Sequence, residues 1–137
     1  MTSAEPLQQS VHLTPEQVLK KAVAQLPNDP DVNGKLASLL KVHGRLDEAA
    51  ASYHRVVEIK PNDLEANFNL GWIHQEEAQL AEAKECYIRA LKFKPDFIEV
   101  YVNLSNTLMN SGQLDDAAIC CSRAIKIDPH LAQIFHR

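Results

Sequence analysis

The chain has 137 residues, a formal net charge of -4 and a sequence pI of about 5.8. This acidic balance argues against non-specific nucleic-acid binding, which needs a basic surface to neutralise phosphates, and against an anionic membrane as the main partner. No apolar run approaches the roughly 20 residues that cross a bilayer, and residues 1–10 lack the features of a secretory signal. We therefore expect a cytoplasmic protein whose partners are neither nucleic acid nor membrane.

The first predicted element is a helix that begins after Thr14 and ends near Leu26. Thr14 and Gln17 have the spacing of a capping box, in which each side chain hydrogen-bonds the backbone N–H of the other residue. Pro15 stands at the first helical position, where its missing N–H is not needed. This helix is expected to be the second helix of an incomplete repeat over residues 14–29.

From Pro27 onward the sequence repeats itself every 34 residues. The recurring prolines are Pro27, Pro61, Pro95 and Pro129. Three other sets keep the same period: Leu36, Leu70 and Leu104; Tyr53, Tyr87 and Cys121; and Val56, Ala90 and Ala124. Between these markers apolar residues recur at the i, i+3, i+4 spacing of one helix face, and a proline ends the second helix of each unit. The pattern predicts a stack of two-helix repeats.

The same markers place the ends of the repeat helices. The first helices are expected near 30–43, 64–77 and 98–111, and the second helices near 47–59, 81–93 and 115–127. Gly44 and Gly112 lie between the two helices of their units, where glycine accepts a positive φ at low cost. Ala78 fills that position in the middle unit, so its turn must form without glycine. Asp29 and Asp63 are the expected N-caps of two first helices.

The period, together with these leucine, glycine, alanine, aromatic and proline markers, resembles the tetratricopeptide repeat over about Pro15 to Arg137. The resemblance implies an all-α fold, an α-solenoid of antiparallel helix pairs in a right-handed superhelix, with a concave groove that binds peptides or partner proteins. We expect a flexible tail over 1–13 and a single domain over 14–137. Within that domain we expect a partial repeat 14–29, full repeats 30–63, 64–97 and 98–131, and the start of a further helix over 132–137.

The C-terminal end of the sequence suggests two interpretations, a fragment of a longer protein or a chain that self-associates. Arg137 comes shortly after the point where another first helix would begin, and no second helix follows to cover its apolar face. The favoured interpretation is that the chain is a fragment of a longer repeat array. Self-association through the uncapped C-terminal end is the alternative.

The resemblance places one side of each first helix in the groove, and the spacing of those residues puts them on one helical face. The predicted groove residues are Lys35, Ser38, Phe68, Asn69, Trp72, Gln75, Val102, Asn103, Asn106 and Asn110. Half of them are amides, which can both donate to and accept from the backbone of an extended peptide, although a plain solvated surface is the alternative. Phe68 and Trp72 are candidate aromatic anchors, with packing between repeats as the alternative.

Chaperone-binding members of the resembling family hold a partner's terminal carboxylate with lysine, arginine and asparagine at fixed groove positions. Of the matching positions in this sequence only Asn69 fits, and Glu99 stands where a cation is needed. Because Glu99 would repel a carboxylate, we do not expect a receptor for chaperone tails.

Motifs for catalysis, cofactors or metals are missing from the sequence. There is no glycine-rich phosphate loop and no His-Glu-x-x-His motif, and His74 is expected to be a hydrogen-bonded packing residue. The sequence therefore predicts a non-enzymatic binding scaffold without cofactor or metal. Asn69 and Asn103 keep the alternative of a substrate-recognition arm open, because they are similar to the asparagine ladder of O-linked N-acetylglucosamine transferases. A self-assembling structural repeat is the third interpretation.

Overall fold

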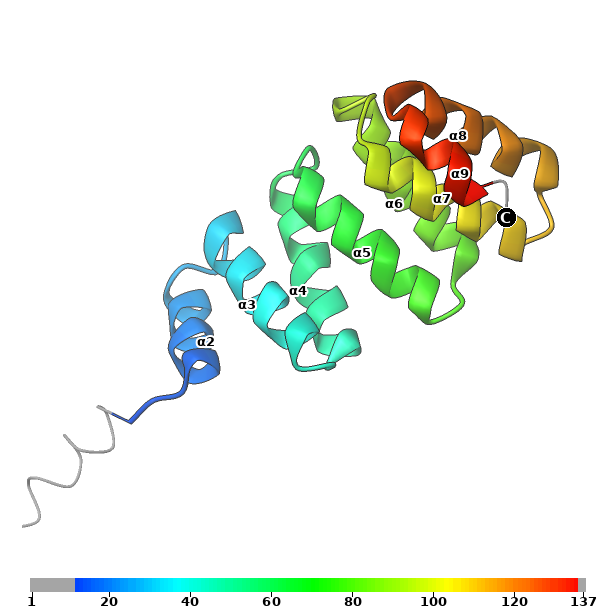
Figure 1. Ribbon diagram of the computed structural model, residues 1–137. Coiled ribbons are helices and arrows are strands. Elements are labelled where there is room, and N and C mark those ends of the chain that lie inside the picture. Colours follow the sequence, from blue (N-terminus) through cyan, green and yellow to red (C-terminus); the bar gives the residue numbers. More distant parts are fainter. Residues whose placement is uncertain (1–11, 136–137) are drawn as a thin grey trace, which may run out of the picture. The chain divides into compact units, whose positions relative to one another are not determined.

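The computed structural model describes residues 12–135, and this range contains helices and turns but no strand (Figure 1). Seven α-helices are followed by a short 3-10 helix, η1, and a last short α-helix. Their bounds are α2 Pro15–Gln25, α3 Pro30–Val42, α4 Leu46–Ile59, α5 Leu64–Glu76, α6 Leu80–Phe93, α7 Ile98–Asn110, α8 Leu114–Ile127, η1 Pro129–Leu131 and α9 Ala132–Phe135. Each of the six expected repeat helices begins and ends within one residue of its predicted bound. The all-α fold of consecutive helix pairs is thereby confirmed. Most of the tail expected over 1–13, and the last two residues of the further helix expected over 132–137, lie outside the described range.

The helix starts follow the predicted capping chemistry. Thr14 and Gln17 form both hydrogen bonds of the capping box, at 2.9 and 3.2 Å. The Asp29 carboxylate accepts from the first backbone N–H groups of α3, and Asp63 accepts from Ala66 N at 2.9 Å. These bonds satisfy donors that have no partner within the helix, which is why the starts of α2, α3 and α5 could be located closely.

The turn inside each repeat requires a left-handed residue. Gly44 and Gly112 have φ values of +75° and +79°, as predicted. Ala78 takes the same conformation, with φ +59°, although it carries a Cβ. The middle turn therefore forms without glycine by placing an alanine in the left-handed region, at a cost of about 1–2 kcal/mol.

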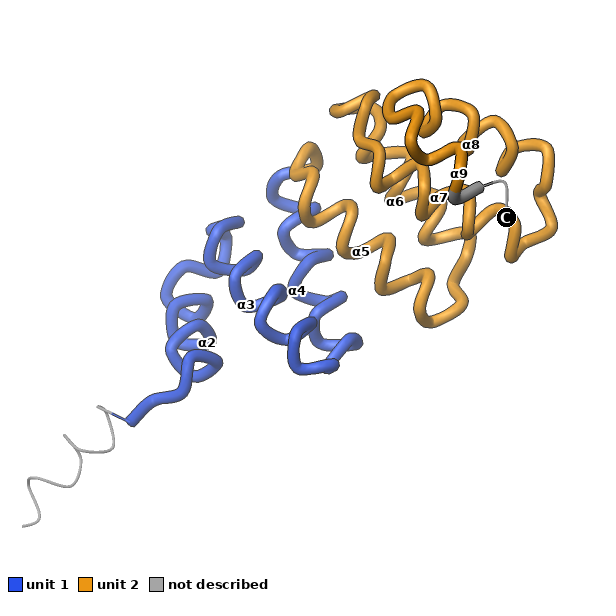
Figure 2. The backbone as a smooth tube through the Cα atoms, in the orientation of Figure 1, with its two compact units in different colours: residues 1–60 blue, residues 61–137 orange. Residues whose placement is uncertain are grey.

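The described helices divide into two compact units, one ending at Lys60 and the other beginning at Pro61 (Figure 2). In the first unit, α3 packs against both α2 and α4. Its buried side chains include Leu40, Tyr53 and Val56, each at most 2 % exposed. The single domain expected over 14–137 stays a prediction.

In the second unit each helix packs on the next, from α5 through α8, and α7 also contacts α5. Its core runs through the repeat markers; it consists of Ala83, Tyr87, Ala90, Val100, Tyr101, Leu104, Leu108, Ala117, Cys120 and Ala124. Because α7 reaches both α5 and α6, the faces of the two first helices in this unit lie next to each other.

Buried polar side chains at another 34-residue spacing hold the turns between repeats. The amide Nδ2 of Asn33 donates to the carbonyls of Pro27 and Asp29, at 3.1 and 2.8 Å. In the next repeat Asn67 Nδ2 donates to the equivalent carbonyls of Pro61 and Asp63, at 3.0 and 2.8 Å. Tyr101 takes the third position, and its hydroxyl donates to Pro95 O at 2.7 Å. A repeated side-chain hydrogen bond therefore fixes these three turns.

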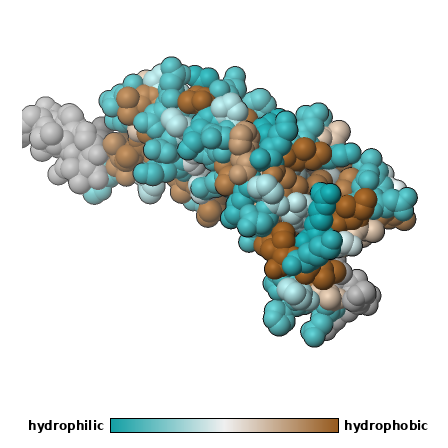
Figure 3. All heavy atoms as spheres, turned by 90° about the horizontal axis from the view of Figure 1, so that it is seen from above, coloured by the Kyte–Doolittle hydropathy of each residue, from teal (hydrophilic) through white to brown (hydrophobic). Residues whose placement is uncertain are grey.

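The surface is mixed in character. On the face drawn in Figure 3, hydrophobic side chains lie in separate patches among hydrophilic ones. Over residues 12–135, none of the helices has the length and apolar character needed to cross a membrane.

Candidate functional site

The candidate site is a cavity of about 310 Å³ in the second unit, beside α7. Its lining comes from α5, α7 and the segment between α8 and α9; the lining residues are Phe68, Ile98, Glu99, Val102, Asn103, Asp128 and Leu131. This volume is at the lower end of the range for ligand pockets, about 300–1,000 Å³, and so suits one or two side chains of a larger partner.

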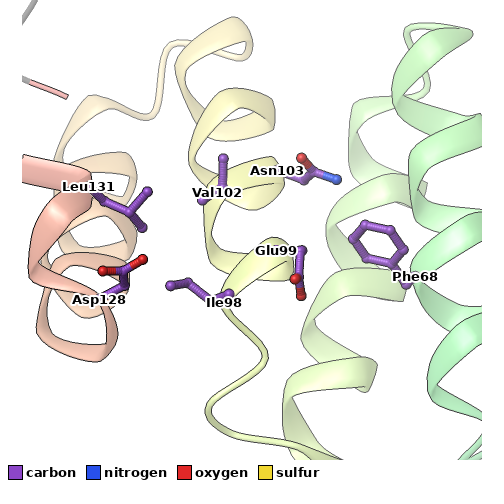
Figure 4. A pocket seen from close by; sticks show the side chains of 7 residues that line it. All are labelled: Phe68, Ile98, Glu99, Val102, Asn103, Asp128 and Leu131. Carbon is purple, nitrogen blue, oxygen red and sulfur yellow. The ribbon is translucent and has the colours of Figure 1, made fainter. Parts of the chain in front are cut away.

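The cavity combines an apolar wall with a polar edge. In Figure 4, Ile98 extends from α7 toward Asp128, and Asn103 extends from the other side of α7 toward α5, where Phe68 lies. Glu99 is exposed at the first turn of α7. The cavity can therefore contact an apolar group and a polar or cationic group together.

Phe68 is held in place by aromatic neighbours. Its ring stacks on Phe97, with centroids 5.4 Å apart, and is tilted against Tyr87 at 6.2 Å. Phe68 is half-buried, so one part of the ring packs inside the unit and another part forms a wall of the cavity. The packing role considered from the sequence is therefore present, and the anchoring role stays a prediction.

Tyr87, on α6, orients two of the predicted groove amides, Gln75 and Asn103. Its side chain is fully buried, and burial raises the pKa of the phenol well above its usual value, so the hydroxyl keeps its proton. The hydroxyl donates to Gln75 Oε1 at 2.8 Å. The Asn103 amide also hydrogen-bonds this hydroxyl. Since the one phenolic proton is used for Gln75, Asn103 must be the donor in its own bond with Tyr87.

The remaining predicted groove residues have different surroundings. Asn106 and Asn110 are exposed on α7, three and seven residues beyond Asn103. Trp72 is half-buried, and Asn69 is buried with 7 % of its surface exposed. Lys35, exposed, and Ser38, half-buried, lie on α3 in the first unit. The structure thus brings Phe68, Val102 and Asn103 together at the cavity and joins Gln75 to them through Tyr87.

Sequence reasoning missed the contribution of Asp128 and Leu131 to the site. The repeat period did contain a signal for Asp128, since the residue before the repeat proline is Lys60, Lys94 and then Asp128. A basic residue is therefore replaced by an acidic one in the last unit. The Asp128 side chain also accepts from His130 N at 3.1 Å, which holds the start of η1 in place.

Nothing at the site suggests a metal. Among residues 12–135 no group of three or more His, Cys, Asp or Glu side chains could hold a metal ion. His74 is half-buried, and its Nδ1 lies 2.6 Å from Gln79 Oε1, which agrees with the predicted hydrogen-bonded packing role.

Comparison with known proteins agrees on the family and the fold. Family models described as "Tetratricopeptide repeat" match residues 16–66, 43–101 and 98–131. A solved structure of MamA is 22% identical, with a TM-score of 0.81, over 83% of this chain and 67% of that chain. A MamA AMB-1 structure is 20% identical, with a TM-score of 0.79, over 83% and 62% of the two chains.

A MamA MSR-1 structure is 20% identical, with a TM-score of 0.75, over 84% of this chain and 66% of that chain. At these identities the likeness concerns the fold alone. The chain spans 62% to 67% of the length of these three structures. No curated protein sequence matches it.

Proposed function

We propose that this chain, which belongs to the tetratricopeptide repeat family, is a scaffold that holds an extended segment of a partner protein along α5 and α7. Repeats of this family are generally scaffolds for protein interaction. What is proposed for this chain is the surface on which the partner binds, along α5 and α7. The observation that carries it is the cavity beside α7, at which three predicted groove residues, Phe68, Val102 and Asn103, meet.

The bonds to Tyr87 support recognition of a peptide backbone. Gln75 uses its oxygen to accept from Tyr87, so its NH₂ group is left to donate. Asn103 uses its NH₂ group toward Tyr87, so its oxygen is left to accept. One donor and one acceptor are therefore presented together, and both are oriented before a partner arrives. Such pre-organisation lowers the entropic cost of binding.

Asn106 and Asn110 extend this polar surface along α7. They are four residues apart and exposed, so they lie on one side of the helix. An extended segment that enters the cavity and continues along α7 would meet Asn103, Asn106 and Asn110 in turn. The acidic character of α5 and α7 favours a protein partner over a nucleic acid.

The two alternative functions gain no specific support. A substrate-recognition arm was suggested by Asn69 and Asn103, but Asn69 is buried, so the two amides do not form an exposed ladder. Self-association through the C-terminal end involves the side chains of Ile134 and Phe135, which are outside the described set.

The test compares two pairs of exposed residues. The variant Asn106→Ala/Asn110→Ala removes the amides on α7, and the matched control Ser122→Ala/Lys126→Ala removes two exposed side chains with the same spacing on α8. Proteins retained from a lysate of the source cells are measured by quantitative mass spectrometry. The α7 pair should lose about thirtyfold in affinity for its partner, since two hydrogen bonds contribute about 1 kcal/mol each.

Circular dichroism first establishes that the unchanged chain and both variants have equal helicity. Loss of the partner with the α7 pair and retention with the α8 pair would support binding along α7. Equal retention by the two variants, or no retained protein at all, would contradict the proposal.

A further inference from the structure

We infer that the cavity beside α7 takes a basic side chain of the partner, a lysine or an arginine. Its aliphatic stem lies against Ile98, Val102 and Leu131, and its cationic end is attracted by the carboxylates of Glu99 and Asp128, which line the cavity on either side of Ile98 (Figure 4). This inference rests on the proposed function, because it specifies the chemistry of a segment that binds at the same site.

The first observation is the charge of the helices that form the site. Helices α5 and α7 contain three acidic residues, Glu65, Glu76 and Glu99, and no lysine or arginine. The helical cations of the second unit lie on α6 and α8; they are Lys84, Arg89, Lys92, Arg123 and Lys126. A partner that follows α5 and α7 therefore meets an acidic surface, and complementary charge selects a basic partner.

The second observation is the lining of the cavity, which contains two carboxylates and no cation. Glu99 takes part in no ion pair within the described part of the chain. Asp128 uses one oxygen for His130 N–H, and an ionised carboxylate can accept further bonds. An incoming anion would therefore be repelled, whereas an ammonium or guanidinium group would find acceptors.

The third observation is that apolar and acidic groups occur together in one small space. Four of the seven lining residues are apolar: Phe68, Ile98, Val102 and Leu131. A wholly polar ligand would leave this wall uncovered, and a wholly apolar ligand would leave Glu99 and Asp128 without a partner. Lysine and arginine match both requirements, because they place an apolar stem on hydrophobic surface and keep the charged end at a polar edge.

Lys94, a cation of the chain itself, lies over the Phe97 ring of the aromatic pair formed by Phe97 and Phe68. Lys94 Nζ is 5.0 Å from the centroid of the Phe97 ring, and Phe97 stacks on Phe68. Lys94 is in the connection between α6 and α7 and does not line the cavity. A positive charge is therefore already accommodated beside the Phe97 ring, next to the cavity. The carboxylates of Glu99 and Asp128 in the lining are not used by Lys94 and are available to a partner.

The test uses a library of randomised nonapeptides with blocked ends, screened against the full chain. Selected peptides are made again with their basic residue replaced by norleucine, which keeps the apolar stem and removes the charge. Fluorescence anisotropy should show that this replacement weakens binding about tenfold, the usual effect of one hydrogen bond to a charged group. Glu99→Gln should remove most of this difference, and so should Asp128→Asn, in which the amide can still cap η1.

The matched control is Glu82→Gln, which changes the net charge equally at an exposed position on α6. This variant should keep the full difference between the lysine and norleucine peptides. Selected peptides without a basic residue, or a preference unchanged in Glu99→Gln and Asp128→Asn, would overturn the inference. Binding lost in Asn106→Ala/Asn110→Ala would still support the proposed function in that case. If the unchanged chain retains no peptide, the proposed function fails, and the inference fails with it.

Discussion

Gly71 on α5 is the position at which a single methyl group should be least tolerated. A Cβ placed there would lie 2.7 Å from Tyr87 Cε1, 2.9 Å from Tyr87 Cδ1 and 3.2 Å from Cys86 Cβ. Tyr87 cannot simply move away, because its ring is fully buried against Phe68 and its hydroxyl is bound to Gln75. Gly71→Ala therefore forces α5 and α6 apart or pushes Tyr87 out of place.

Gly34 provides the matched control for the magnitude. It lies in the interior of α3, and a Cβ there would find only Val56 Cγ2, at an ordinary 3.9 Å. Both substitutions gain the helix propensity of alanine over glycine, about 0.8–1.0 kcal/mol. Gly34→Ala should raise the free energy of unfolding by about this amount. The free energy of unfolding of Gly71→Ala should be lower than that of Gly34→Ala by the cost of overpacking, about 1–3 kcal/mol.

Urea unfolding followed by circular dichroism at equal protein concentration measures both free energies of unfolding. Equal m-values in the two variants would show that the midpoints can be compared directly. A Gly71→Ala variant as stable as Gly34→Ala would refute the expected overpacking. Ala37 and Ser105 occupy the position of Gly71 in the neighbouring repeats, and both carry a Cβ. Equal stability would therefore mean that the second unit makes room for a Cβ at this position as well.

Three further predictions concern stability. Ala78→Gly should stabilise the chain by about 1 kcal/mol, because it relieves a left-handed alanine, and thermal melting should show a higher midpoint. Asn67→Ala should destabilise it by about 2–3 kcal/mol, because the carbonyls of Pro61 and Asp63 lose the Asn67 side-chain donor and Arg89 loses its acceptor, whereas the exposed Asn62→Ala should change the urea midpoint little. Hydrogen bonding by Arg45 holds the pKa of Glu48 below its ordinary value of 4.5. A carboxyl group with a lowered folded-state pKa stabilises the fold above pH 4.5, and this contribution is lost as the pH falls through the lowered pKa. The melting temperatures of the unchanged chain and Arg45→Gln should therefore differ near neutral pH and converge below pH 4.5, and a difference that persists in acid would contradict this account.

The helices could be predicted closely because several local signals agreed on the same bounds. Thr14, Asp29 and Asp63 cap helices through bonds to residues only two or three positions away. Gly44 and Gly112 mark turns whose conformation few other residues adopt. Each of these effects acts within one turn of backbone, so the sequence alone contains what is needed to locate it.

The candidate site was less predictable because it depends on contacts between repeats. The sequence indicated that Gln75 and Asn103 face the groove, but their orientation comes from Tyr87, a residue of another helix. Asp128 and Leu131 join the cavity only because η1 turns back beside α7. Local patterns do not report such contacts.

The buried amides Asn33 and Asn67 are a second feature that was not predicted from the sequence. Asn33 and Asn67 follow the 34-residue period, yet their role in holding the turns was not recognised. Asparagine is usually exposed, so its presence alone gives no sign of a buried role. Repetition of a hydrogen-bonding residue at the full period, continued by the hydroxyl of Tyr101, is the signal that could have identified them.

Site-specific photo-crosslinking can show which helix of the second unit a partner segment contacts. A benzophenone amino acid is placed at Asn106 on α7 or at Ser122 on α8, both exposed, and the chain is irradiated in an extract of the source cells. Sequencing of the crosslinked peptides identifies the partner segment. We expect a partner segment to be captured from Asn106 and not from Ser122, with a lysine or arginine within a few residues of the crosslink. Capture from Ser122 alone, or equal capture from both positions, would contradict binding along α5 and α7.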